Sequence, residues 1–200
     1  ILSNEEEAHL GYLGAKLEQD LEAGTMVDIG GGSTELTSIK GGFDLAKTSI
    51  PQGSLSSFAN YVAGLMPTQK EVNAIAQAFR ELAEKEETDV YHCTQLYGIG
   101  GSIRSAAKLY GDLCNNGNRF NYLLPEHIDA ILNRYAEDPN AFAHEALRTL
   151  PDRIHTLIPG CVIIREAFKL CGGERLDICK YGVREGYLAE RVLVKPVSFA

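Results

Sequence analysis

Three consecutive glycines stand between two apolar segments of β type, in the run from Met26 to Glu35 (MVDIGGGSTE). Glycine lets the backbone adopt positive φ and approach a ligand closely, so that successive N–H groups can point at one anion. A hydroxyl and two carboxylates beside the glycines favour a phosphate site that also handles a divalent cation. A plain hairpin turn is the alternative, but it needs neither three glycines nor an acid on each side.

The composition limits the class of protein. The chain has 200 residues and 44% hydrophobic content, which is enough for one large domain or two small ones with a buried core. A net charge of −8 argues against a nucleic-acid-binding protein. No apolar leader or long apolar run indicates secretion or a membrane. The five cysteines form no C-x-x-C pair, which favours free thiols in a reducing cytoplasm over zinc or disulfides.

The apolar periodicity predicts an α/β domain in which an antiparallel meander of three strands is joined by glycine turns. Thr68 and Glu71 have the spacing of a capping box, so we expect a helix to begin there. The predicted strands are 25–29, 35–39, 43–50, 95–99 and 176–179. The predicted helices are 5–18, 68–83, 103–109, two within 125–150 broken near Asp138-Pro139, 159–171, and a last one ending near Val192.

Three glycine-containing turns follow predicted strands, at residues 30–33, 98–102 and 182–186. The second and third precede helices, where free N–H groups and the helix dipole favour bound phosphate. Each turn alone is common as a purely structural connection. Together, at the carboxyl ends of strands, they indicate a ligand site at that edge of the sheet. The predicted phosphate-binding residues are Gly30, Gly31, Gly32, Ser33, Gly100, Gly101 and Ser102.

The acids beside the first turn are candidates for catalysis and metal binding. Asp28 and Glu35 flank the glycines and could hold a Mg²⁺ ion that bridges phosphate oxygens. A capping or turn acid is the alternative for each, and it carries more weight for Glu35. The triplet Glu5-Glu6-Glu7 has the composition of an ordinary helix start, and composition does not single out one of the three.

Motifs along nearly the whole chain resemble those of the exopolyphosphatase/guanosine pentaphosphate phosphohydrolase (Ppx/GppA) family. Residues 2–10 (LSNEEEAHL) resemble its ISGxEEARL motif, and residues 27–35 (VDIGGGSTE) match its DIGGGSTE loop without a gap. Residues 98–103 (GIGGSI) resemble its G-x-x-G-T/S turn. Pro159-Gly160 and residues 182–186 (GVREG) resemble its closing PG and G-x-R-E-G elements.

The resemblance implies an actin-like (ribonuclease H-like) α/β fold of two lobes with the active site between them. Residues 1–200 would be the second lobe, and the N-terminal lobe would be absent from this chain. By the family pattern Glu7 is the catalytic base, Asp28 and Glu35 place metal or water, and residues 30–33 hold phosphate. The sequence departs from the pattern at Asn4, at His9 and at Lys180-Tyr181, where the family often has Ser-Asp.

The function implied by the resemblance is release of terminal orthophosphate from inorganic polyphosphate with Mg²⁺ or a similar ion. A guanosine pentaphosphate phosphohydrolase, a non-catalytic phosphate or nucleotide sensor and an ATP-dependent kinase of the actin-like superfamily are the alternatives. We expect the isolated chain to be nearly inactive, because a cleft needs both walls. We also expect an exposed apolar or mixed face where the missing lobe would pack, which favours a homodimer.

Overall fold

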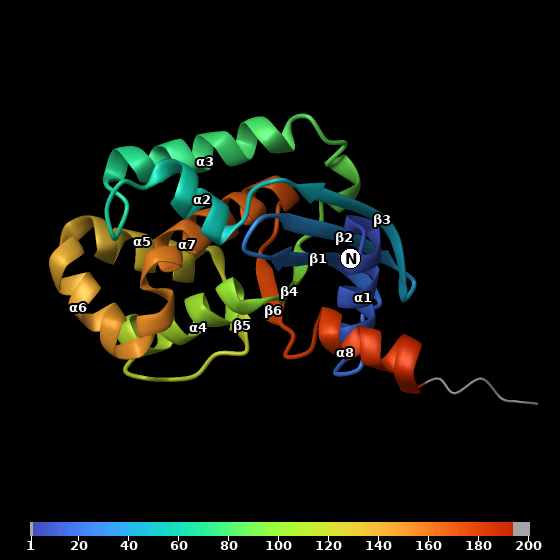
Figure 1. Cartoon of the computed structure of the whole chain (residues 1–200). Coiled ribbons are helices and arrows are strands. Elements are labelled where there is room, and N and C mark those ends of the chain that lie inside the picture. Colours follow the sequence, from blue (N-terminus) through green and yellow to red (C-terminus); the bar gives the residue numbers. More distant parts are fainter. Residues whose placement is uncertain (1, 194–200) are drawn as a thin grey trace, which may run out of the picture.

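A computed structural model of the chain describes residues 2–193 (Figure 1). The strands are β1 (Ala23–Ile29), β2 (Thr34–Lys40), β3 (Phe43–Ile50), β4 (Gln95–Ile99), β5 (Tyr122–Leu123) and β6 (Arg175–Ile178). The helices are α1 (Asn4–Lys16), α2 (Ser54–Tyr61), α3 (Gln69–Ala83), α4 (Gly101–Cys114), α5 (Pro125–Glu137), α6 (Pro139–Thr149), α7 (Ile154–Cys171) and α8 (Val183–Tyr187). Short 3₁₀ turns lie at η1 (Asp89–Tyr91) and η2 (Pro151–Arg153), and a π-helical turn, η3 (Leu188–Leu193), follows α8.

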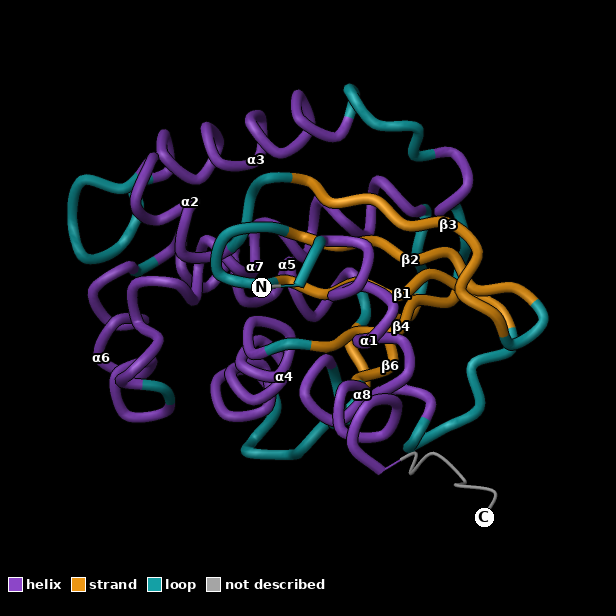
Figure 2. The backbone as a smooth tube through the Cα atoms, turned by 45° about the vertical axis from the view of Figure 1, so that its right-hand side comes forward, coloured by secondary structure: helices purple, strands orange, loops and turns teal. Residues whose placement is uncertain are grey.

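The strands form one mixed sheet of six in the order β3-β2-β1-β4-β6-β5. The meander β1–β2–β3 is antiparallel, as predicted, while β4 pairs parallel to β1 and β6 pairs parallel to β4. The carboxyl ends of β1, β4 and β6 therefore meet at one edge of the sheet (Figure 2). This is the edge at which ligands bind in open α/β sheets.

Strand alternation sends successive side chains to two different cores. Val27 and Ile29 of β1 belong to the large core, to which α4 and α7 contribute. Met26 belongs to a smaller core with Tyr12 and Ala15 of α1. Helices α4 and α7 thus cover one face of the sheet, whereas α1 and α8 pack together on the other (Figure 1).

Helix ends follow the polar residues of the sequence. Ser3 and Glu6 form a capping box at the start of α1, and Thr68 and Glu71 form the predicted one at the start of α3. Asp138 ends α5 and caps α6, so the predicted break near Asp138-Pro139 is confirmed. Each capping side chain satisfies N–H groups that have no partner inside the helix.

Two predicted helices have wrong boundaries. The helix expected over 103–109 spans Gly101–Cys114. The helix expected to begin at Pro159 begins at Ile154, with Pro159 inside it. Proline lacks an N–H group and is common in a first helical turn, which made it a plausible start. Burial of Ile154, Leu157 and Ile158 stabilises the preceding turn and offsets the single hydrogen bond that Pro159 cannot make. Neither α2 nor the short strand β5 was predicted from the sequence.

Over residues 2–193, the longest helices fall short of the length or apolar content that crossing a bilayer requires.

Candidate active site

Two acids face each other across the first pair of strands. Asp28 of β1 and Glu35 of β2 are partners in the antiparallel register, and they share a face with Met26 and Ile39, which pack in the core next to α1. Directly opposed side chains have Cβ atoms about 4.5–5.5 Å apart. The alternation of two strands therefore brings these carboxylates together on the α1 side of the sheet.

The negative charge of Glu7, in the first turn of α1, acts on both of these carboxyl groups. Burial, as the largest cause, and the negative charges of Glu35 and Glu7 together raise the pKa of Asp28 to about 7, against the opposing positive charge of Arg104. Burial also raises the pKa of Glu35, and the Glu7 charge acts in the same direction. Repulsion among like charges at close range favours the protonated form of one of them. The three predicted catalytic acids are thus neighbours.

The Glu35 carboxylate is held by two hydroxyl groups. Ser33 and Ser49 both donate hydrogen bonds to Glu35 Oε1, the second at 3.0 Å. These bonds oppose the effect of burial on the Glu35 pKa without reversing it. The Ser33 hydroxyl, predicted as a phosphate ligand, is therefore engaged with Glu35.

The carbonyl groups of the glycine turn point toward α2. The Ser54 N–H donates to the Gly30 carbonyl at 3.0 Å, the Ser56 N–H to the Gly31 carbonyl at 2.8 Å, and the Ser56 hydroxyl to the Gly32 carbonyl at 3.2 Å. In the described part of the chain, the N–H groups of Gly31 and Gly32 have no protein acceptor. These groups remain available to an anion.

The second glycine turn forms the start of α4 beside Asp28. Gly100 has a φ of +96°, and a Cβ there would lie 2.6 Å from Oδ1 of Asp28, so the position requires glycine on both counts. No side chain caps α4, unlike α1 and α3. A Cβ at Gly101 would lie 2.4 Å from Nη2 of Arg153, so this guanidinium covers the uncapped helix N-terminus.

A pocket of about 520 Å³ lies between the two glycine turns. Of the predicted residues, the pocket is lined by Asp28, Gly30, Gly31, Gly100, Gly101 and Ser102. Gly32, Ser33, Glu35 and Glu7 do not line it. Arg153 of η2 and His155 in the first turn of α7 also line it. The combination of free N–H groups, a helix N-terminus and a guanidinium suits an anion.

The third glycine turn, at residues 182–186, has a packing role and not the predicted place in the ligand site. Residues 182–186 do not line this pocket, although β6 ends at the same edge of the sheet. A Cβ at Gly14 would lie 2.0 Å from the Gly182 carbonyl, and one at Gly186 would lie 1.9 Å from the Leu10 carbonyl. Glycines therefore let α8 pack closely against α1. The Glu185 carboxylate accepts the Gly182 N–H at 2.9 Å, so this helix start is already capped by an acid.

Asp28 and Glu35 are the two candidate metal ligands. Over residues 2–193, no three His, Cys, Asp or Glu side chains converge closely enough to hold an ion alone. Mg²⁺ commonly binds through one or two carboxylates and completes its shell with water and substrate phosphates. The carboxylates of Asp28 and Glu35, with an anion in the pocket, fit that mode of binding.

Sequence reasoning missed Arg153 as a site residue. It lies 125 positions after Asp28, in a segment without a glycine turn, where only the neighbouring Asp152 is charged. Only the path of the chain after α6, through the turn η2, brings it over Gly101. Ser54 is a second site residue that was not predicted from the sequence. Its hydroxyl donates to the Gly30 carbonyl at 3.2 Å and accepts from the Ser102 hydroxyl at 3.1 Å.

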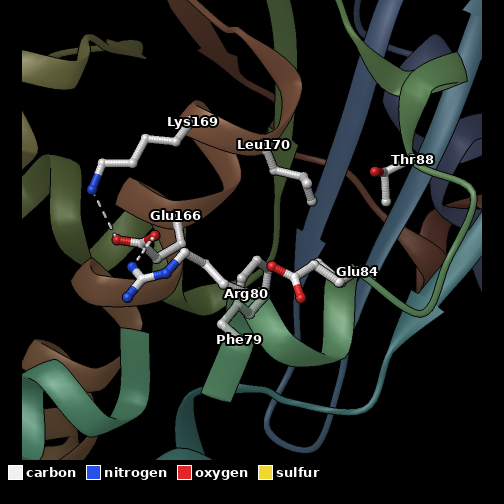
Figure 3. A pocket seen from close by; sticks show the side chains of 8 residues that line it. Phe79, Arg80, Glu84, Thr88, Glu166, Lys169 and Leu170 are labelled. Carbon is white, nitrogen blue, oxygen red and sulfur yellow. Dashed lines mark hydrogen bonds and ion pairs between the residues drawn. The ribbon is translucent and has the colours of Figure 1, made fainter. Parts of the chain in front are cut away.

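A second pocket, of about 460 Å³, lies between α3 and α7 (Figure 3). Glu166 is buried there, and its carboxylate accepts hydrogen bonds from Arg80 at 2.8 Å and Lys169 at 3.0 Å. Burial acts to raise the pKa of Glu166, but the hydrogen bonds and charges of Lys169 and Arg80 outweigh it and hold the pKa below its ordinary value. The charges of this pocket are therefore matched within the protein.

The fold is an α/β lobe with a pocket that suits an anion, and comparison with known families places it. The family model of the Ppx/GppA phosphatase family matches residues 1–195. The chain therefore belongs to the Ppx/GppA phosphatase family.

Solved structures agree with this placement. A Ppx/GppA family member from Aquifex aeolicus shares 25% sequence identity over 96% of this chain and 63% of its own, with a TM-score of 0.77. An exopolyphosphatase from Cytophaga hutchinsonii shares 17% identity over 93% of this chain and 62% of its own, also with a TM-score of 0.77. The predicted actin-like α/β fold with a mixed sheet is confirmed. This chain spans less than two thirds of the length of these structures.

Proposed function

We propose that this chain is the second lobe of a two-lobed phosphoanhydride hydrolase that releases terminal orthophosphate from linear polyphosphate. Family membership supports a phosphatase, and the similar C. hutchinsonii protein is described as an exopolyphosphatase. The observation that carries the proposal is the juxtaposition of an anion pocket with three mutually repelling acids. The anion pocket would bind the phosphate, and the acids would hold a metal ion and activate water.

The terminal phosphoryl group would occupy the pocket between the glycine turns. The N–H groups of Gly31, the uncapped N-terminus of α4 at Gly101 and the guanidinium of Arg153 would neutralise its oxygens. A phosphoanhydride already has a good leaving group, so positioning and charge neutralisation account for most of the catalysis.

A Mg²⁺ ion would be held by Asp28, with Glu35 beside it, and by phosphate oxygens of the substrate. When bound, such an ion supplies positive charge that neutralises the transferring phosphate. Burial and repulsion by Glu35 and Glu7 raise the pKa of Asp28, and a bound cation would offset both effects, which supports this assignment. The Ser33 and Ser49 hydroxyl groups fix the orientation of the Glu35 carboxylate.

Glu7 would act as the general base. Glu6 is engaged with Ser3 and with Arg191 at 2.9 Å, whereas Glu7 has no ion-pair partner within 4.0 Å in the described chain. Of the three glutamates, Glu7 is the one whose charge acts on both Asp28 and Glu35. It would take a proton from water as the water oxygen bonds to phosphorus and the bridging P–O bond breaks. The shortened polyphosphate leaves with the bridging oxygen.

The test uses the full-length protein with Mg²⁺, and long-chain polyphosphate and guanosine pentaphosphate are assayed in parallel for released orthophosphate. Glu7→Gln should lower kcat by about 10²–10⁴-fold, because it removes general-base assistance. Glu5→Gln is the matched control, since Glu5 is an exposed neighbour on the same helix turn, and it should keep wild-type turnover.

The substrates separate the possible outcomes. Release from polyphosphate at the higher kcat/KM supports the proposal, and preference for guanosine pentaphosphate would redirect it to a nucleotide phosphohydrolase. Wild-type turnover by Glu7→Gln on both substrates would rule out Glu7 as the base. Binding of polyphosphate without any phosphate release would support a sensor instead of an enzyme.

A further inference from the structure

One polar side chain of the pocket between the glycine turns has no part in the proposed function, the imidazole of His155. His155 lies in the first turn of α7, and its half-buried ring meets the ring of Phe58 from α2 edge-on, with centroids 5.1 Å apart. Helices α2 and α7 pack against each other, so this contact holds the imidazole between two supported elements. A ring that is held in this way presents its N–H group in a constant direction.

The ring nitrogens of His155 have no partner within the described protein. Over residues 2–193, neither nitrogen makes a hydrogen bond or an ion pair, whereas the rings of His9 and His127 both do. In either neutral tautomer an imidazole keeps one N–H donor, and in its charged form it has two. A donor that lines a pocket and has no acceptor from the protein is available to a ligand.

The two sides of the pocket differ in the donors that they offer to an anion. On the α4 side are the uncapped helix N-terminus and the guanidinium of Arg153. On the α2 side, the N–H groups of Ser54, Leu55 and Ser56 are already bound by carbonyl groups of the first glycine turn. In the described part of the chain, Arg153 and His155 are the two lining side chains that carry nitrogen. The α2 side therefore depends on His155 for a nitrogen donor.

The positions of the acids set the direction in which a leaving group departs. Asp28 and Glu35 lie on the side of the sheet that α1 covers, and Glu7 belongs to α1. Helix α7 covers the opposite face (Figure 1). In phosphoryl transfer the attacking and leaving oxygens lie roughly in line, on opposite sides of phosphorus. Water that is activated on the α1 side therefore requires departure toward α7, where His155 lies.

We infer that His155 is a catalytic residue that donates a ring N–H hydrogen bond to the bridging oxygen of the substrate. The inference rests on the proposed function and adds a group on the leaving side of the reaction. The water oxygen bonds to phosphorus, its proton passes to Glu7, and the P–O bond to the bridging oxygen breaks. The electron pair of that bond stays on the bridging oxygen. Because the hydrogen bond strengthens as this charge develops, it favours the transition state over the bound substrate.

The first experiment measures phosphate release from long-chain polyphosphate by variants of the full-length protein with Mg²⁺. His155→Leu removes the donor and keeps a side chain of similar size, whereas His155→Gln keeps an N–H donor of similar reach. His144→Leu is the matched control, because His144 is exposed on α6 and lies outside the pocket. Thermal unfolding verifies that all three variants are folded.

His155→Leu should lower kcat by about 10²-fold, the low end for general acid–base groups, since the leaving group is already good. Its KM should change much less, because the hydrogen bond is weaker in the bound substrate. His155→Gln should lose less than His155→Leu, and the control should keep the wild-type kcat and KM. A wild-type kcat in His155→Leu, or equal losses in the two His155 variants, would contradict the inference and leave the proposed function intact.

A second measurement does not depend on turnover. The NMR signal of the His155 ring is identified by its absence from the spectrum of His155→Leu. Pyrophosphate, which has a bridging oxygen, should shift this signal, whereas orthophosphate, which has none, should shift it much less. If wild type releases no phosphate, the proposed function fails, and this comparison still decides whether His155 contacts a bridging oxygen. Equal shifts with both anions, or no shift in a protein that binds pyrophosphate, would overturn the inference.

Discussion

Two pockets of this lobe each contain an arginine and a carboxylate, but the two groups are arranged differently in each. In the pocket between α3 and α7, Arg80 and Lys169 bind Glu166, so the charges are matched (Figure 3). In the pocket between the glycine turns, Arg153 lies over Gly101 and has no carboxylate within 4.0 Å in the described chain. Asp28 faces other acids across the sheet.

This difference separates a pocket built for stability from one built for a ligand. The buried Glu166 carboxylate has three basic side chains within 4.0 Å, and its pKa is lowered. A carboxylate near pKa 7 and an unpaired guanidinium need a cation and an anion from outside. Under the proposed function, a metal-bound phosphate would supply both.

Truncating the unpaired arginine should have the largest effect in this comparison. Arg153→Ala removes the guanidinium at the start of α4, and phosphate release by the full-length protein should fall by about 10²-fold or more. Arg80→Ala is the matched change in the other pocket and should leave turnover within a factor of two. Equal losses in both variants would show that the two arginines do not differ in role.

Removing the paired carboxylate should affect stability instead. Glu166→Gln loses charge-assisted hydrogen bonds to Arg80 and Lys169 and should lower the free energy of unfolding by about 2 kcal/mol at pH 7. The difference should shrink in acid, since the lowered pKa of Glu166 makes its contribution disappear as pH falls through that pKa. Chemical denaturation measures it. A fall in kcat without a fall in stability would contradict the assignment.

The sequence predicted the local parts of the site well and the distant parts poorly. The meander over β1, β2 and β3 followed from alternation and glycine turns, and it placed Asp28 opposite Glu35 in register. The place of Gly100 in a turn between a strand and a helix also followed from the sequence. These features depend on neighbours in sequence, which periodicity and turn chemistry describe.

Features that depend on packing could not be read from periodicity. Arg153 reaches the site through the connection between α6 and α7, and Pro159 obscured where that helix begins. The turn at residues 182–186 resembled the other glycine turns, but its glycines serve the close approach of α8 to α1. A glycine needed for helix packing and a glycine needed for phosphate have the same appearance in a sequence.

The free energy of unfolding of Asp28→Asn at pH 8, without divalent ions, tests most directly whether Asp28 is held ready for a ligand. A carboxyl whose pKa is raised from 3.8 to about 7 favours the folded state fully only below pH 3.8, and that contribution is lost as pH rises through 7. The neutral variant should be more stable than wild type on the order of 2 kcal/mol at pH 8, and the gap should close near pH 4. An Asp28→Asn variant that is less stable at pH 8, with no change in the gap in acid, would contradict the account.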